Sequence, residues 1–177
     1  MPLSNRIAEC GFPPGSAMDR RWIEQAFFRD SYRFPITGEC ADPVAVFHAV
    51  FGHHPWYFKA ALLTRNFIAG LFGLAVPSAS AVLRPASNKA ARVGEAIGAW
   101  PLFALAPREL VAGRDNKHLD FRLSVLIEVE DRGTFSVIST ACVVHNWFGR
   151  IYLCFVVPFH KWGVRRLIVR ALAAGRL

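Results

Sequence analysis

The feature that most constrains the fold is a change to two-residue hydrophobic periodicity in the second half of the chain. Residues 118–130 and 134–145 alternate apolar and polar side chains, and a short polar segment ending in Gly133 connects them. Such alternation is typical of antiparallel strands that are covered on one face. Three-residue connections with a left-handed glycine are common in hairpins, so we predict a hairpin in which Glu130 opposes Thr134.

This register gives the predicted sheet one apolar face and one mixed face. The mixed face carries His118, Asp120 and Arg122 at alternate positions. We interpret this charged row as the solvent-facing side of the sheet and not as a catalytic set, because charges on exposed strands discourage edge-to-edge aggregation. The predicted apolar face carries Leu119, Phe121, Leu123, Val125, Ile127 and Val129 opposite Phe135, Val137, Ser139, Ala141, Val143 and His145.

The remaining elements are predicted on either side of this hairpin. A short helix is expected within residues 17–28, followed by a first strand at residues 30–36. A helix pair kinked at residues 52–55 comes next, and Asp42 and Pro43 suit the cap and first turn of its first helix. Two shorter strands and a long C-terminal helix complete the prediction, at residues 100–105, 108–113 and 148–177.

Length and composition favour a single domain. The chain has 177 residues, of which 53% are hydrophobic, and this is enough for one substantial core. We therefore expect one α+β domain over residues 1–177, with an N-terminal extension at residues 1–29. Residues 76–95 are mostly small or polar, and we expect a long loop or lid there.

The chain is basic, with a formal net charge of +8 and a pI of about 9.9. A basic surface favours anionic partners such as acidic lipid, nucleic acid or phosphorylated small molecules. Most of the arginines are scattered along the sequence, and they do not interleave with aromatic residues on one recognisable face. We therefore expect no specific nucleic-acid binding.

The sequence predicts a cytoplasmic protein without a transmembrane segment. Residues 66–83 carry no formal charge, but Asn66, Pro77 and Ser78 interrupt the apolar pattern that a span of about 20 residues requires. The first residues contain no apolar stretch typical of a secretory signal. The four cysteines have no C-x2-C spacing, so we expect reduced thiols.

No motif identifies a reaction. We find no nucleophile elbow, phosphate-binding loop or dinucleotide-binding glycine motif. His48, His53 and His54 lie close in sequence, but a spacing of five across a helix break does not fit a zinc site on one helix. We expect neither a metal nor a cofactor, and the sequence identifies no catalytic residue.

The order of elements resembles a known architecture. A strand, a helix pair, several antiparallel strands and a long final helix resemble the helix-grip fold of the START and Bet v 1-like (SRPBCC) superfamily. In that fold a curved antiparallel sheet wraps around the C-terminal helix. At the level of motifs, the chain resembles a bacterial family known only as domain of unknown function 2867. The similar stretches span most of residues 30–167 and are DSYRFP, FGHHPWYFKAALLTRNFIAGLFGL, IGAWPLFAL, ELVAGRDNKHLDFRLSV and VHNWFGRIYLCFVVPFHKWGVRRL.

The resemblance implies a fold and a cavity between sheet and final helix, but no established activity and no catalytic residues. Domains of this family occur alone or fused behind an NAD(P)-binding epimerase-like domain. The resemblance therefore implies a partner protein of that kind.

Three hypotheses for function follow. The first is a module that binds a hydrophobic small molecule between the apolar sheet face and the last helix. The second is a cyclase-like or hydratase-like enzyme on the same scaffold, with His145 as the first group to test. The third is an interaction module that docks through its basic or apolar helices. The residues predicted to line the ligand site are Phe121, Leu123, Phe135, Val137, Ala141, His145, Phe155 and Phe159.

Overall fold

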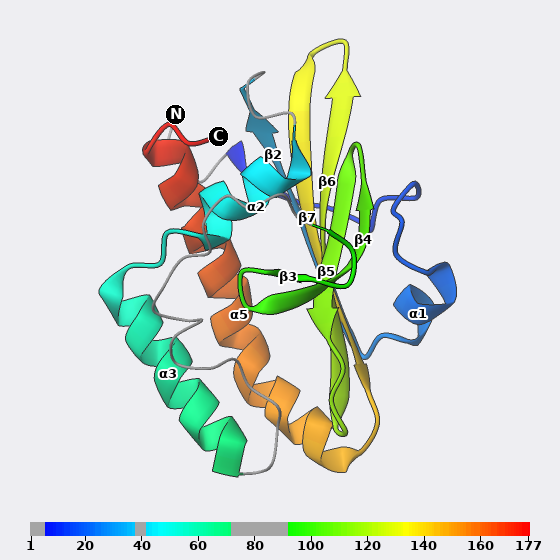
Figure 1. Ribbon diagram of the computed structural model, residues 1–177, viewed down its shortest axis with the longest axis vertical. Helices are drawn as coiled ribbons and strands as arrows, with labels where there is room; N and C mark the ends of the chain where they lie inside the picture. The colour runs from blue at the N-terminus through cyan, green and yellow to red at the C-terminus, as the bar shows by residue number, and fades with distance from the viewer. Residues whose placement is uncertain (1–5, 38–41, 72–91) are drawn as a thin grey trace.

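In the computed structural model, an antiparallel sheet is covered on one face by helices (Figure 1). The structure describes residues 6–37, 42–71 and 92–177. The strand order is β1-β2-β7-β6-β5-β4-β3, so the sheet is open and begins and ends in two-residue strands. The strands are β1 (Ala8–Glu9), β2 (Phe28–Ile36), β3 (Ala96–Ile97), β4 (Trp100–Ala106), β5 (Glu109–Arg114), β6 (Leu119–Glu130) and β7 (Gly133–Val144).

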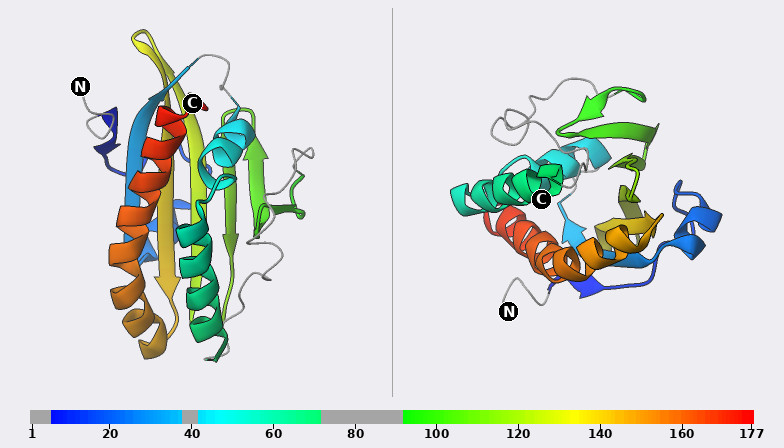
Figure 2. Two further views of the ribbon diagram at one scale, coloured as in Figure 1. Left: turned by 90° about the vertical axis from the view of Figure 1, so that its left-hand side faces the viewer. Right: turned by 90° about the horizontal axis from the view of Figure 1, so that it is seen from below.

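The helices divide between the two faces of the sheet. They are α1 (Arg20–Gln25), α2 (Pro43–Phe51), α3 (Trp56–Leu71) and α5 (Trp147–Ala173). Figure 1 shows α2, α3 and α5 on one side of the sheet and α1 on the other, and both views of Figure 2 show α3 and α5 side by side. We call the face that carries α5 the inner face and the face that carries α1 the outer face. The architecture is α+β, as predicted.

The main core lies on the inner face. Buried side chains of β2, β5, β6 and β7 pack there against α2 and the second half of α5. A smaller cluster of Met18, Val111 and Ala141 lies on the outer face under α1. The sheet is therefore covered on both sides along part of its length, because the segment before β2 folds over the outer face.

The hairpin of β6 and β7 is confirmed, but its predicted register is wrong by one residue. Glu130 pairs with Gly133, and Val129 pairs with Thr134, so the connection has two residues. Gly133 has a φ of 132°, a conformation that favours glycine, as expected. Because side chains alternate between faces, the shift of one residue inverts the whole of β7 relative to β6.

The inversion redistributes the predicted apolar face. Leu123 of β6 pairs with Thr140, and Arg122 pairs with Ala141. Leu123, Val125 and Ile127 therefore share the inner face with Ile138 and Thr140. Ala141 packs in the cluster under α1, on the face opposite α5. Five residues of β7 were predicted to face α5 but lie on the outer face. They are Phe135, Val137, Ser139, Ala141 and Val143.

The charged row lies on the outer face, as predicted, but it is not fully exposed to solvent. Only 15% of the side-chain surface of Arg122 and 20% of that of Asp120 is exposed to solvent. The Arg122 guanidinium lies 3.7 Å from the ring centre of Phe103 and 5.3 Å from that of Trp22. The row is half-buried because α1 and β4 flank it.

Local sequence signals explain the helix boundaries. Asp42 caps α2 by accepting hydrogen bonds from the backbone N–H groups of Val44 and Ala45, at 3.2 and 3.1 Å. Gly52 ends α2, and α3 begins at Trp56, so two helices lie where the helix pair was predicted. The side chain of Asn146 caps α5 by accepting a hydrogen bond from Gly149 N at 3.1 Å.

The buried side of α5 corrects a second prediction. Leu153, Val164, Leu167, Ile168 and Ala171 are buried at helical spacing and define the side that packs on the sheet. Phe155 and Phe159 point away from the sheet, with 70% and 76% of their surface exposed. The prediction failed because α5 carries apolar residues on both sides, so apolarity alone did not identify its sheet-facing side.

Two further predictions concern the loop at residues 76–95 and the absence of a transmembrane segment. The predicted loop at residues 76–95 lies outside the described residues, apart from residues 92–95. None of the helices in the described ranges is long and apolar enough to cross a membrane.

Candidate functional site

An acidic residue lies on the otherwise apolar inner face of β2. Asp30 follows the same alternation as Tyr32, Phe34 and Ile36, which are all in the main core. It pairs in register with Thr140 of β7, which is also buried. Strand alternation thus places a carboxylate beneath α5, where burial of an unpaired charge is unfavourable.

His160 of α5 is the partner of this carboxylate. Its Nε2 lies 3.3 Å from both oxygens of Asp30, and the hydrogen bond is made with Oδ1. Only 1% of the Asp30 side chain is exposed, whereas His160 keeps 22%. The ring of Phe28 meets the imidazole edge to face at 5.5 Å between centres. The carboxylate therefore holds the imidazole from behind, and the imidazole keeps partial access to solvent.

Two buried polar atoms of this group have only electrostatic partners of irregular geometry, because Asp30 Oδ2 lies 3.3 Å from His160 Nε2 and Tyr32 interacts with Asp30. Within the described part of the chain, neither Asp30 Oδ2 nor the Tyr32 hydroxyl makes a hydrogen bond in acceptable geometry. Burial raises the pKa of Tyr32 far above its ordinary value, and the charge of Asp30 raises it further. Tyr32 is therefore a neutral phenol that can donate. Buried polar atoms are normally satisfied, so this group is suited to receive hydrogen bonds from water or a ligand.

The apolar surroundings of the pair are only partly buried. Leu119, Cys142 and Leu153 are buried there, but the side chains around them keep partial exposure. We call these residues together the half-buried cluster. Its partly exposed members come from β2, β6, β7 and the first half of α5, and they are Phe28, Phe121, Val144, Tyr152 and Val157. In contrast, the second half of α5 is tightly packed through Val164, Leu167, Ile168 and Ala171.

The arrangement has a definite chemical capacity. An imidazole held by a carboxylate can accept a proton from a ligand or donate one to it. A neutral phenol and a carboxylate oxygen next to it supply one donor and one acceptor. In residues 6–37, 42–71 and 92–177 there is no group of three or more His, Cys, Asp or Glu side chains placed to hold a metal ion.

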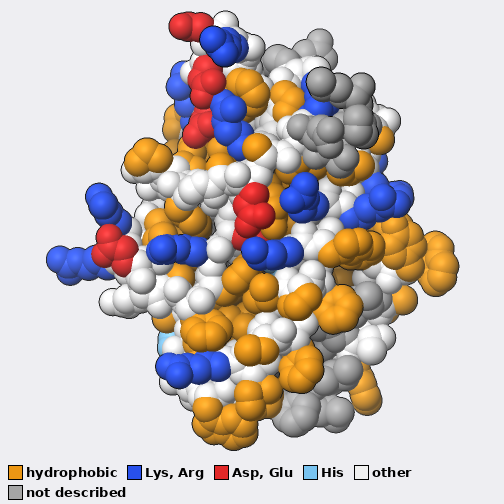
Figure 3. Space-filling model, turned by 180° about the vertical axis from the view of Figure 1, so that it is seen from behind, with side chains coloured by type: hydrophobic (Ala, Val, Ile, Leu, Met, Phe, Trp, Pro, Cys, Tyr) orange, Lys and Arg blue, Asp and Glu red, His pale blue; other side chains and the backbone are white. Residues whose placement is uncertain are grey.

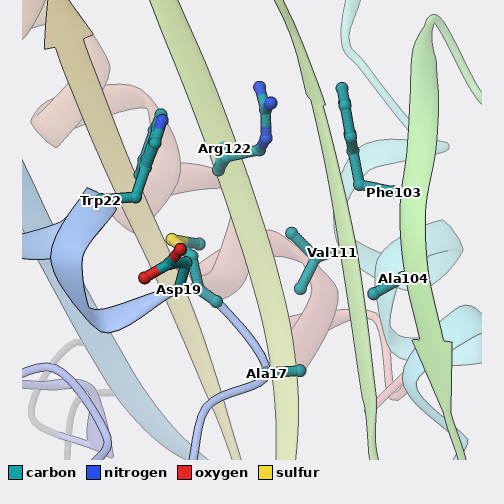
Figure 4. A pocket seen from close by; sticks show the side chains of 8 residues that line it. Ala17, Asp19, Trp22, Phe103, Ala104, Val111 and Arg122 are labelled. Carbon is teal, nitrogen blue, oxygen red and sulfur yellow. The ribbon is translucent and has the colours of Figure 1, made fainter.

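A pocket lies on the outer face (Figure 4). Its volume is about 230 Å³, and Figure 4 shows Arg122 between Trp22 and Phe103 at its rim. Arg122 already forms an ion pair with Asp115. The cation of this pocket is thus neutralised within the protein, and we regard the inner group as the stronger site. The lining residues are Ala17, Met18, Asp19, Trp22, Phe103, Ala104, Val111 and Arg122.

The structure brings together only part of the predicted ligand wall. Phe121 belongs to the half-buried cluster, and Leu123 lies in the inner core. Phe135, Val137 and Ala141 lie on the outer face because of the register shift. His145 forms an ion pair with Asp120, 3.0 Å away, and does not reach Asp30 or His160 in any described contact. Phe155 and Phe159 point away from the sheet.

Sequence reasoning missed Asp30, Tyr32 and His160. Two signals could have found them. Asp30 is the only acid on the alternation that contains Tyr32, Phe34 and Ile36. His160 lies four residues before Val164, on the buried stripe of α5. Neither signal shows that the two residues meet, because that contact joins segments 130 residues apart.

These observations define a class: an α+β protein in which an antiparallel sheet and a C-terminal helix hold a buried carboxylate–imidazole pair beside partly exposed apolar side chains. A family profile described as "Protein of unknown function (DUF2867)" matches residues 22–167. The chain belongs to this family, and Asp30, Tyr32 and His160 all lie within the matched residues. A search of curated proteins gave no match.

Proposed function

We propose that the protein binds an apolar small molecule between the inner face of the sheet and the first half of α5. The observation that carries the proposal is the position of the Asp30–His160 pair. It lies where the tightly packed core ends and the half-buried cluster begins. Pockets with mostly apolar walls and a few convergent polar groups are typical ligand sites. On this interpretation the sheet and α5 form a helix grip over a single domain.

The polar side chains of Tyr32 and Asp30 restrict which chemical class of ligand the proposed site can bind. Tyr32 supplies a hydroxyl donor, and Oδ2 of Asp30 supplies an acceptor. A ligand carbonyl would accept from Tyr32, and a ligand hydroxyl would donate to Asp30. Phe28 and Phe121 add aromatic surface on the walls. The ligand class is therefore a largely apolar molecule, flat enough for aromatic contact, with one carbonyl or hydroxyl group.

Filling the proposed site tests this function. Val157 is half-buried in the cluster, so Val157→Phe should place a larger side chain in the proposed site. We expect uptake of the neutral dye N-phenylnaphthylamine to fall several-fold, while the melting temperature stays near that of the wild type. Ile168 is fully buried in the main core, so the control Ile168→Phe should overpack it and cost about 1–3 kcal/mol. Absence of dye uptake by the wild type, with equal destabilisation in both variants, would contradict a binding site.

The pair itself favours a second candidate function, proton transfer at a carbonyl-containing ligand. An imidazole held by Asp30 can remove a proton next to a carbonyl and return one to the same carbon. Once native mass spectrometry of the purified protein has identified a bound ligand, that ligand can be incubated in deuterium oxide. The wild type should exchange carbon-bound hydrogen for deuterium, and His160→Gln should still bind but not exchange. Binding without exchange by the wild type would leave binding as the function.

The NAD(P)-binding epimerase-like partner stays a prediction from the family resemblance. We propose that such a domain, where it accompanies this one, acts on the molecule that the half-buried cluster holds.

A further inference from the structure

The side of α5 that faces away from the sheet carries a continuous apolar stripe. Its five residues follow each other at spacings of four, four, four and three, which places them on one side of a helix. Their exposure ranges from 48% to 76%. Single exposed apolar residues are ordinary, but a contiguous row of large ones indicates an interaction surface. The stripe residues are Trp147, Ile151, Phe155, Phe159 and Trp162.

The neighbouring helix α3 contacts the C-terminal end of this stripe. Phe58 of α3 stacks on Trp162 of α5, with the rings 9° from parallel and 5.9 Å apart. Gly163 allows this contact, because a Cβ there would lie 2.9 Å from the Phe58 ring. Both views of Figure 2 show the two helices side by side, which agrees with this ring contact.

The charge on these helices has one sign. Residues 56–71 and 147–173 contain no Asp or Glu. Arg150, Arg165, Arg166 and Arg170 of α5 are exposed. Among the Lys and Arg residues of α5, only Lys161 forms an ion pair within the described residues, at 3.3 Å from Glu9. Figure 3 shows hydrophobic side chains over the lower part and right-hand edge of the molecule, with Lys and Arg side chains near them.

We propose that the stripe of α5 docks the protein on an anionic lipid surface. Exposed Trp and Phe side chains favour the membrane interface, and flanking Arg residues attract acidic headgroups. A second copy of the chain is a poor occupant, because two copies would bring like charges together. None of the described helices can span a bilayer, so α5 would lie in the interface with its apolar stripe down.

Vesicle binding of the full chain tests this inference. Co-sedimentation is measured with phosphatidylcholine vesicles with and without phosphatidylserine, together with the shift of tryptophan emission. We expect binding only with phosphatidylserine, and weakening with salt. Arg165→Gln combined with Arg166→Gln should weaken it about ten- to thirtyfold, given roughly 1 kcal/mol per basic residue near the membrane. Phe155→Ser combined with Phe159→Ser should abolish it.

The control is Val129→Ser, which removes an apolar residue that lies outside the stripe, near the tip of the β6–β7 hairpin, and is 56% exposed. It should bind like the wild type, and all variants should keep the wild-type melting temperature because the changed residues are exposed. Equal binding to both vesicle types, or no binding to either, would overturn the proposal. So would a concentration-dependent dimer that the Phe155 and Phe159 changes dissociate, because the stripe would then be a contact between copies.

Discussion

At the scale of single residues, the inner face is defined by an acid whose neighbours are apolar. Asp30 is almost completely buried, and its only recorded ionic partner in the described chain is His160. A buried charge persists where its partner and hydrogen bonds compensate for lost hydration. Tyr32, two residues along the same face, experiences that charge directly. Asp30 therefore links the other two residues, because it pairs with His160 and raises the pKa of Tyr32.

The coupling within this group gives a first prediction. In Asp30→Asn the negative charge that raises the pKa of Tyr32 is removed, whereas the burial that raises it most remains. We expect the pKa of Tyr32 to fall but to stay above its ordinary value of 10.0. Titration of the tyrosine ring carbons by NMR measures this. An unchanged Tyr32 titration would show that the carboxylate and the phenol are not coupled.

A second prediction concerns stability at acidic pH. Burial lowers the pKa of His54 below its unfolded value of 6.5, and burial does the same for His48. The unfolded chain therefore takes up the proton first, so this stability is present above pH 6.5 and is lost as the pH falls through the folded pKa. We expect His54→Gln to lose less stability than the wild type over that interval. Identical pH profiles in chemical denaturation would contradict the burial of His54.

At the scale of elements, the hairpin and α5 decide which residues can meet. The connection between β6 and β7 has two residues, and Gly133 has a positive φ with open space around it. Gly133→Ala should therefore cost about 1 kcal/mol from backbone strain alone. Gly11 also has open space but no positive φ, so Gly11→Ala should be close to neutral. Equal unfolding free energies for the two variants would argue against the strained turn.

The first turn of α5 gives another prediction. A Cβ on Gly149 would clash with the backbone carbonyl of His118 and lie 2.9 Å from Val144. Alanine is ordinarily better than glycine in a helix by about 1 kcal/mol, but the clash with fixed backbone should outweigh this. We expect Gly149→Ala to destabilise by about 1–3 kcal/mol. Gly15→Ala, which meets no atom within 4 Å, is the control, and a stabilised Gly149→Ala would refute the close approach.

Most elements could be predicted from the sequence because their signals are local. Asp42 and Pro43 indicate the start of α2, and alternation indicates β6 and β7. The pairing register of β6 and β7 could not be predicted from such local signals. Glycine at position 133 is compatible with connections of two or three residues, and a difference of one residue moves Ala141 to the opposite face.

The candidate site could be predicted even less. Both sides of α5 carry aromatic and aliphatic residues, so spacing alone did not decide between Phe155 and His160 as the sheet-facing residue. Close packing decided it, because Gly149, Gly163 and Ala171 allow one side to approach other elements. The contact of Asp30 with His160 is long-range and leaves no local pattern.

At the scale of the whole molecule, α5 serves both proposals. Its sheet-facing side carries Tyr152, Val157 and His160 toward the half-buried cluster. Its opposite side carries the stripe proposed to contact lipid. An apolar ligand that partitions into the bilayer would therefore meet the protein next to the helix that covers its site. The outer face, with its half-buried Arg122 and the cluster under α1, takes no part in either role.

The most direct test of the central claim is to locate a bound apolar probe by NMR. In methyl-labelled protein titrated with N-phenylnaphthylamine, we predict shifts for Val157 and Val144 methyl groups and for the His160 ring. Met18, Ala104 and Val111, which line the outer pocket, should not shift. Perturbations confined to those three residues, or absent throughout at dye saturation, would contradict a ligand site between the sheet and α5.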